Sequence, residues 1–231
     1  MRSKALAAAI VAAFGLLASA CVSTSGSSAT GQPSATGQPS QPSPASPTQS
    51  AVPVQSPVPV ESNPPGDIPD NTQFVAYRSS GGHFTVRVPE GWSRRTAAGS
   101  VSFTDKLNTV QVTWAPASAA PTLTSAKAND VPMLRRTVLA FALSKIIGCA
   151  PSCTIPYSTA PISVALPLRA VVITYRANSR PNAVTGKQYR LEVLRFEFFR
   201  GGEEAALTLS GPVGSDNVDP WRLVSESFGW S

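Results

Sequence analysis

Histidine and charged residues are scarce in this chain: of 231 residues, one is a histidine (His83) and 14% are charged. A Ser–His–Asp triad would need His83, but no G-x-S-x-G elbow is present, and strand alternation predicts a surface position for this side chain. H-E-x-x-H, glycine-rich phosphate loops and D-x-D clusters are also missing. Glu203 and Glu204 are adjacent on an expected strand, so their side chains should diverge instead of forming an acid–base pair. The sequence therefore predicts no catalytic residue, no cofactor and no metal site.

The uncharged apolar stretch Ala5–Ala20 is too short for a membrane-spanning helix. As a helix it would rise about 24 Å, less than the roughly 30 Å of a bilayer's hydrocarbon core. Arg2 and Lys4 precede the stretch, and small residues end it. This pattern is typical of a signal peptide, which we expect over residues 1–20.

Cys21 follows that stretch directly, in the sequence Leu17, Ala18, Ser19, Ala20, Cys21. These residues resemble the lipobox of bacterial lipoproteins, although leucine is commoner at the position of Ala18. The resemblance implies a diacylglyceryl thioether on Cys21, cleavage after Ala20, and anchoring to the extracytoplasmic face of the cell membrane. The alternative is an ordinary secretory signal that is followed by an incidental cysteine.

The two other cysteines, Cys149 and Cys153, lie close together in the sequence "CAPSC". Exported proteins are usually oxidised, so we expect a disulfide that closes a small loop and contributes about 2 kcal/mol. A redox pair is the rival interpretation, but the usual redox spacing, C-x-x-C, is one residue shorter. A zinc site would need further ligands, and the chain has a single histidine.

Residues 22–70 are rich in Ser, Pro, Thr, Gly and Gln, and they contain the repeat "ATGQPSATGQPS". Such a composition buries too little apolar surface to offset its chain entropy. We therefore expect residues 21–70 to be a lipidated N-terminus and a disordered tether. The tether is a spacer in the simplest interpretation, and its Pro, Ser and Thr content also permits O-glycosylation.

Residues 71–231 are long enough for one folded domain with its own core. This part has 17 basic and 10 acidic residues, a net charge of +7. A basic domain held near a membrane suggests contact with anionic lipid or a wall polymer, while the alternative is that the charge only maintains solubility. Export makes a nucleic-acid partner improbable.

Apolar alternation predicts six strands in this domain. A further strand, over residues 74–79, is expected before them from a family resemblance. In the strand expected at residues 189–199, the apolar residues change from the odd-numbered to the even-numbered positions, which predicts a bulge near Val193 and Leu194. The expected strands are residues 74–79, 83–88, 100–105, 108–114, 169–176, 189–199 and 204–211.

Helical spacing predicts a long central helix from Ser125 to about Ile147, with Pro132 in its first turn and Gly148 at its end. Its apolar positions are Val131, Leu134, Val138 and Phe141.

A second helix is expected near the C-terminus, with Asp219 as its cap, Pro220 at its first position and Gly229 at its exit. Its apolar stripe, which should face the sheet, consists of Trp221, Val224 and Phe228. These strands and helices predict an α+β domain with antiparallel strands.

The two ends of the domain resemble a known family. The stretch "GGHFTVRVPEGW" is similar to the start of PsbP-like domains, and "DNVDPWRLVSESFGW" looks like the closing helix of the LpqN-type actinobacterial lipoproteins of that superfamily. The resemblance implies an α-β-α sandwich on one mainly antiparallel sheet, with no catalytic residues to transfer. Trp92 is expected to be a core anchor. The residues that carry the first motif are Gly82, Phe84, Val86, Pro89, Gly91 and Trp92.

Two non-catalytic functions follow from these patterns. In the first, the domain is a tethered adaptor that binds an envelope protein or a wall component through a basic or aromatic surface. In the second, it carries a lipid or another apolar small molecule in a cavity between sheet and helix. A carrier should have a roomy apolar cavity, whereas an adaptor should have a filled core and an exposed patch.

Overall fold

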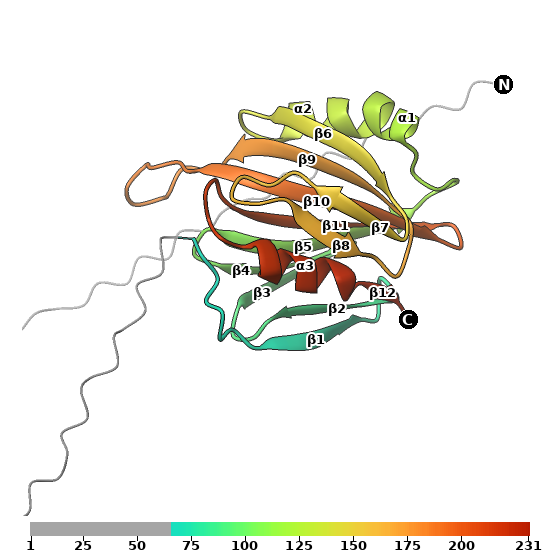
Figure 1. The fold of residues 1–231 in the computed structure, drawn as a ribbon, viewed down its shortest axis with the longest axis horizontal. Coiled ribbons are helices and arrows are strands. Elements are labelled where there is room, and N and C mark those ends of the chain that lie inside the picture. Colours follow the sequence, from blue (N-terminus) through green and yellow to red (C-terminus); the bar gives the residue numbers. More distant parts are fainter. Residues whose placement is uncertain (1–65) are drawn as a thin grey trace, which may run out of the picture. The chain divides into compact units, whose positions relative to one another are not determined.

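The structure of the protein is a computed structural model, which describes residues 66–231. Its largest element is a seven-stranded sheet in the order β3-β4-β5-β11-β10-β9-β6, in which every neighbouring pair is antiparallel (Figure 1). We call this the large sheet. Its strands are β3 (Ser93–Ala97), β4 (Ser100–Asp105), β5 (Asn108–Pro116), β6 (Ala142–Cys149), β9 (Ala170–Asn178), β10 (Arg190–Arg200) and β11 (Glu203–Pro212).

One face of the large sheet is covered by a helical layer, which consists of α1 (Leu123–Ser125), the π-helical turn η1 (Ala126–Asp130) and α2 (Val131–Thr137). Thr122 caps the start of this layer by exchanging hydrogen bonds with Ser125. The apolar residues buried between the layer and the sheet are Ala126, Leu134, Val171, Ile173, Tyr175, Ala177 and Val193.

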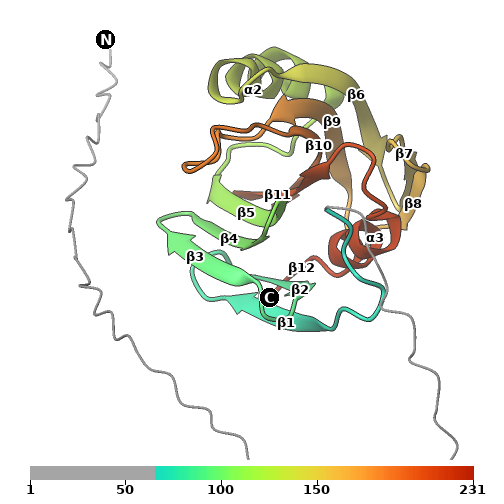
Figure 2. The same ribbon diagram turned by 90° about the vertical axis from the view of Figure 1, so that its left-hand side faces the viewer.

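The opposite face packs against three elements, and Figure 2 shows the large sheet between them and the helical layer. The first is a small sheet of β1 (Phe74–Ser79), β2 (Phe84–Pro89) and β12 (Gly229–Trp230), the second is the hairpin of β7 (Ser152–Ile155) and β8 (Ile162–Ala165), and the third is helix α3 (Val218–Glu226). Phe228 stacks on both Phe84 and Phe198, at ring-centroid distances of 5.5 and 4.3 Å. This packing joins the small sheet to the large one through a core of apolar side chains.

The α+β class and the antiparallel strands are therefore as predicted. All seven expected strands are present, with boundaries shifted by at most two residues. The layer opposite the helices is more elaborate than an α-β-α sandwich implies, because a second sheet and a hairpin lie beside α3.

The prediction of one long central helix is wrong beyond Thr137. The helix ends there, Val138 has an extended backbone and Ala140 has a φ of +50°. Residues 142–149 then form β6, which pairs with β9 and provides an edge strand of the large sheet. Val138 and Phe141 still pack against the helix-side core, but they do so from the connecting turn. Pairing with β9 therefore overrides the helical spacing of these residues.

The predicted bulge near Val193 and Leu194 is also wrong, because the register of β10 with both neighbours runs without interruption. The large sheet is buried on both faces at this strand. Val193 points to the helical layer, whereas Leu194 and Phe196 belong to the core of the opposite face. The one shift of register in the large sheet lies in β6, between Leu143 and Lys145.

The C-terminal helix is present, but it begins two residues earlier than predicted. Its N-cap is Asn217, so Asp219 lies in the first turn and is not the cap. Gly229 does not close the helix either, because the cap is Ser227 and Gly229 begins β12. The predicted stripe of Trp221, Val224 and Phe228 is buried, with each side chain at most 1% exposed.

The chain is already part of the domain at Gly66, before the predicted boundary at residue 71. The carbonyl of Gly66 accepts a hydrogen bond from the side-chain amide of Asn108, and Ile68 is buried with its N–H donating to Asn217 Oδ1. The predicted signal peptide, the anchor at Cys21 and the rest of the tether lie outside the described residues. Among residues 66–231, no helix is long and apolar enough to cross a membrane.

Candidate functional site

The predicted pair of cysteines is joined in the structure. The sulfur atoms of Cys149 and Cys153 are 2.13 Å apart, and their Cα atoms are 5.1 Å apart. The bond connects the end of β6 to β7 and so fixes the hairpin to the edge of the large sheet. Cys21 and Ala20, the predicted lipidation and cleavage positions, lie outside the described residues.

The residues considered for catalysis do not converge. His83 is exposed in the turn before β2, and its Nδ1 lies 3.6 Å from Glu203 Oε2. Glu204 points to the other face of β11, toward Asp130 and Arg195. The two carboxylates therefore diverge, as strand geometry predicts. Within residues 66–231, no group of three or more His, Cys, Asp or Glu side chains is placed to hold a metal ion. Trp92 is only half-buried and packs at the margin of the core.

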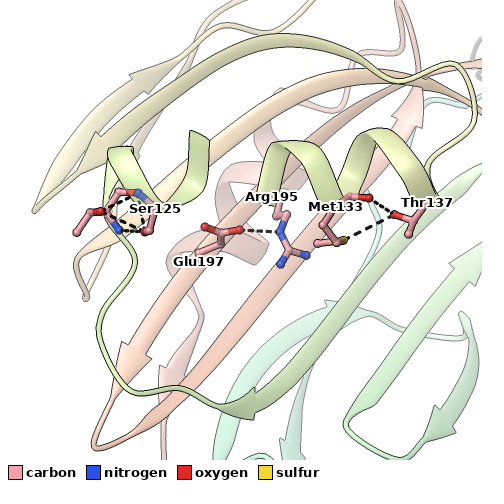
Figure 3. A network of polar contacts seen from close by, with 6 residues as sticks. Ser125, Met133, Thr137, Arg195 and Glu197 are labelled. Carbon is pink, nitrogen blue, oxygen red and sulfur yellow. Dashed lines mark hydrogen bonds and ion pairs between the residues drawn. The ribbon is translucent and has the colours of Figure 1, made fainter. Parts of the chain in front are cut away.

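A group of charged side chains lies beneath the helical layer, and we call Asp130, Arg195, Glu197 and Glu204 the charged cluster. Figure 3 shows Arg195 and Glu197 side by side under the helices, with Arg195 Nε donating to Glu197 Oε1 at 2.9 Å. Glu197 is fully buried, and its second oxygen, Oε2, has no hydrogen-bond partner among the described residues. The five-residue π-helical turn η1 contributes Asp130 at its end.

Burial raises the pKa of three carboxyl groups in this cluster. The pKa of Glu197 rises from 4.5 to about 7, because desolvation outweighs the attraction of Arg195, and Asp130 and Glu204 repel the charged form further. Desolvation also raises the pKa values of Asp130 and Glu204. A perturbed pKa often marks a functional site, but the enclosed Glu197 carboxyl cannot touch a substrate. The cluster is therefore a source of pH-dependent stability.

A second group of charges gathers at one end of the large sheet. The connection from α2 to β6 lies beside the end of β9, because Ala142 pairs with Arg176, and the β9–β10 loop follows there, because Asn178 pairs with Arg190. The β4–β5 turn is also at this end, since Lys106 lines the same depression as Lys187. Arg190 also joins two of these segments, because its Nη1 donates to Ala140 O at 2.9 Å. We call this region the basic end. Its cationic residues are Lys106, Arg135, Arg136, Arg176, Arg180, Lys187 and Arg190, and all of them are exposed.

The basic end contains a depression of about 320 Å³. Lys106, Arg180 and Lys187 line it together with Asn182 and Tyr189, and no acidic side chain contributes to its wall. Three cations around a space of this size attract an anion, and the amide and phenol groups add hydrogen-bonding capacity.

The sequence predicts a positive net charge for the whole domain, but it does not predict that the cations gather at this end of the large sheet. A signal was available, because residues 131–191 contain eight Lys or Arg residues and no Asp or Glu. That segment supplies every cation of the basic end except Lys106.

Comparisons with known proteins give similarity at the level of the fold. No protein-family model matches the chain, and no curated protein matches its sequence. The solution structure of cyanobacterial PsbP from Synechocystis is 14% identical, with a TM-score of 0.42 over 69% of this chain and 94% of that one. LpqN of Mycobacterium tuberculosis, described as involved in cell envelope biogenesis, is 11% identical, with a TM-score of 0.35 over 69% of this chain and 91% of that one.

The Ran-binding protein Mog1p of Saccharomyces cerevisiae is 8% identical, with a TM-score of 0.42 over 69% of this chain and 96% of that one. The chain spans about half, 48%, of a further similar structure from Bacteroides thetaiotaomicron. At these identities and TM-scores the similarity concerns the fold alone.

Proposed function

We propose that the protein is a lipid-anchored, non-catalytic accessory protein on the extracytoplasmic face of the cell membrane, and that it docks on an anionic envelope component through the basic end. The observation that carries this proposal is the concentration of seven exposed cations around one end of the large sheet. The exposed acid Asp105 lies beside Lys106 in the β4–β5 turn, so the basic end keeps a large excess of positive charge. Such a surface attracts partners of the opposite sign and raises their rate of association.

The sequence supports the location. The lipobox-like residues before Cys21 and the apolar stretch that precedes them suit an exported chain whose mature N-terminus carries a lipid. The disulfide between Cys149 and Cys153 suits an oxidising compartment. A tether of more than forty residues would let the domain reach partners at some distance from the membrane.

No observation favours the alternative function, a carrier of an apolar molecule. Packed side chains such as Leu134, Ile173 and Tyr175 fill the space between the large sheet and the helical layer. On the opposite face of the large sheet, Phe196, Phe198 and Trp221 belong to the packed core. The depressions found in the described part of the chain lie on the surface and have mixed polar and apolar walls. A carrier needs an enclosed, largely apolar space.

The test is affinity copurification of the full chain from its native host, with two triple variants. All six side chains are exposed and make no ion pair among residues 66–231, and each variant replaces three cations by three anions, so the two variants are matched in charge. The basic-end variant is Arg136→Glu, Arg180→Glu and Lys187→Glu, and the control variant is Arg78→Glu, Arg87→Glu and Arg169→Glu.

We expect the control variant to retain its envelope partners and the basic-end variant to lose them. If the two variants keep the same partners, the basic end does not dock on an envelope protein. Fractionation of Cys21→Ser after a high-salt wash, which removes any contact made by exposed charges, tests the anchor separately, since this variant should carry no lipid and should be either unprocessed or secreted. Persistence of cleaved Cys21→Ser in the salt-washed membrane at the wild-type level would contradict the anchor.

A further inference from the structure

The most exposed apolar side chain in the described part of the chain lies in the middle of the basic end. Val184 is 93% exposed in the β9–β10 loop, which projects from the domain in Figure 1. Apolar side chains are normal on surfaces when they are scattered singly. This one is not isolated, because four of the six exposed large apolar residues lie at the basic end: Leu139, Leu143, Val184 and Tyr189.

The loop that presents Val184 has a defined conformation. Asn182 Oδ1 accepts hydrogen bonds from the N–H groups of Val184 and Thr185 at 3.0 and 2.9 Å. The N–H of Asn182 donates to Lys187 O, and that of Gly186 donates to Asn182 O. Ser179 closes the base of the loop, since its Oγ accepts from Tyr189 N at 3.0 Å. The loop therefore holds Val184 outward with cations on both sides, at Arg180 and Lys187.

Taking the proposed location at the membrane as the starting point, we infer that the basic end binds the surface of an anionic phospholipid bilayer. Val184 and the neighbouring apolar side chains enter the interface, while the cations contact lipid phosphates. Apolar residues ringed by Lys and Arg are typical of surfaces that lie on anionic membranes. The long aliphatic stems of Lys and Arg add apolar contact while their charged ends stay at the phosphates.

The geometry favours a bilayer over a protein partner. Arg135, Arg136, Arg180 and Lys187 have side chains without hydrogen bonds or ion pairs among residues 66–231, so they can adjust to phosphates that have no fixed arrangement. A specific protein site usually combines a well-packed pocket with hydrogen bonds of defined direction. Here Val184 projects outward, and the depression of about 320 Å³ between the cations is open at the surface and has three cations in its wall, which can contact lipid phosphates.

The test is sedimentation with lipid vesicles of residues 21–231 carrying Cys21→Ser, the whole expected mature chain without its anchor. The vesicles are phosphatidylcholine alone or a mixture with phosphatidylglycerol. We expect binding to the anionic vesicles only, and loss of that binding as salt is raised, because exposed charges are screened. The basic-end variant should bind roughly a hundredfold more weakly and the control variant almost normally.

A second pair of variants tests the apolar contact. Val184→Ser should weaken binding several-fold, whereas Val75→Ser, the same change at a 43% exposed position on β1, should not. Equal binding to both kinds of vesicle, or equal weakening by the two triple variants, would overturn the inference.

Two further outcomes separate this inference from the proposed function. If the wild type does not bind vesicles, but the basic-end variant loses an envelope protein in the host, the lipid inference fails and the proposed function stands. If vesicle binding follows the prediction while copurification is unchanged, the bilayer contact stands and the docking of another envelope component fails.

Discussion

Replacing Glu197 by glutamine tests the energetics of the charged cluster. Because burial raises the pKa of Glu197 from 4.5 to about 7, the folded state binds a proton more tightly than the unfolded state does. The resulting stabilisation is fully present below about pH 4.5 and is lost as the pH rises through about 7. At 1.36 kcal/mol per pKa unit, the loss is on the order of 3 kcal/mol. Asp130 and Glu204 also lose stabilising free energy as the pH rises, since burial raises their pKa values too.

Glutamine keeps the shape of Glu197 and cannot ionise. Removing one partner of a buried ion pair commonly destabilises a protein by about 3–5 kcal/mol, but Arg195 retains two other carboxylates, Asp130 and Glu204. We therefore expect Glu197→Gln to be more stable than the wild type at pH 8, by up to about 3 kcal/mol, and the difference to shrink to less than about 1 kcal/mol at pH 5.

Urea unfolding between pH 5 and pH 8 measures this difference. Glu203→Gln is the matched control, because Glu203 is on the same strand as Glu204 and points away from the cluster, so its effect should be small. A Glu197→Gln variant that is less stable than the wild type at pH 8 would show that the glutamate is a stabilising anion, and would refute the reasoning.

Two other predictions concern the fold. Trp221 is 1% exposed and its Nε1 donates to Tyr157 Oη at 3.3 Å, so Trp221→Ala should cost about 3–5 kcal/mol and lower the melting temperature by roughly 6–20 °C. Arg222→Ala removes only an exposed ion pair with Asp219 and should change the melting temperature little, and an unchanged curve for Trp221→Ala would contradict the docked helix. Mature protein isolated from the host should have no alkylatable thiol at Cys149 or Cys153 without reductant, and mass spectrometry that finds both alkylated would contradict the disulfide.

The strands were predictable wherever one face of the strand is buried. Phe84, Val86 and Val88 of β2 are buried while Arg87 is exposed, so the alternation in the sequence indicates the structure directly. β3 gave no such signal, because all five of its residues are exposed at the edge of the large sheet. β6 was mistaken for helix, since its pairing with β9 is a long-range contact that local spacing does not contain.

The error at β10 had a physical cause that relates to the charged cluster. Arg195 and Glu197 occupy the face of β10 under the helical layer, and Glu192 occupies the opposite face, where it accepts a hydrogen bond from Ser158 N. Polar residues therefore replace apolar ones on a different face in each half of the strand. The resulting shift in the apolar pattern looks like the shift that a bulge would cause, although β10 continues without a bulge.

The basic end could be predicted only in part. The absence of acidic residues from 131–191 is visible in the sequence. Nothing in the periodicity indicates that the turn at Lys106, the end of α2 and the β9–β10 loop meet at the same end of the large sheet, because this depends on strand order.

Photo-cross-linking from position 184 in the native host tests the central claim, that the basic end is the docking face. A photo-reactive amino acid replaces Val184 in one strain and the exposed Arg169, the residue before β9, in another. The account predicts adducts with envelope lipid or an envelope protein from position 184 and none from position 169. Equal adducts from the two positions, or adducts from position 169 alone, would contradict it.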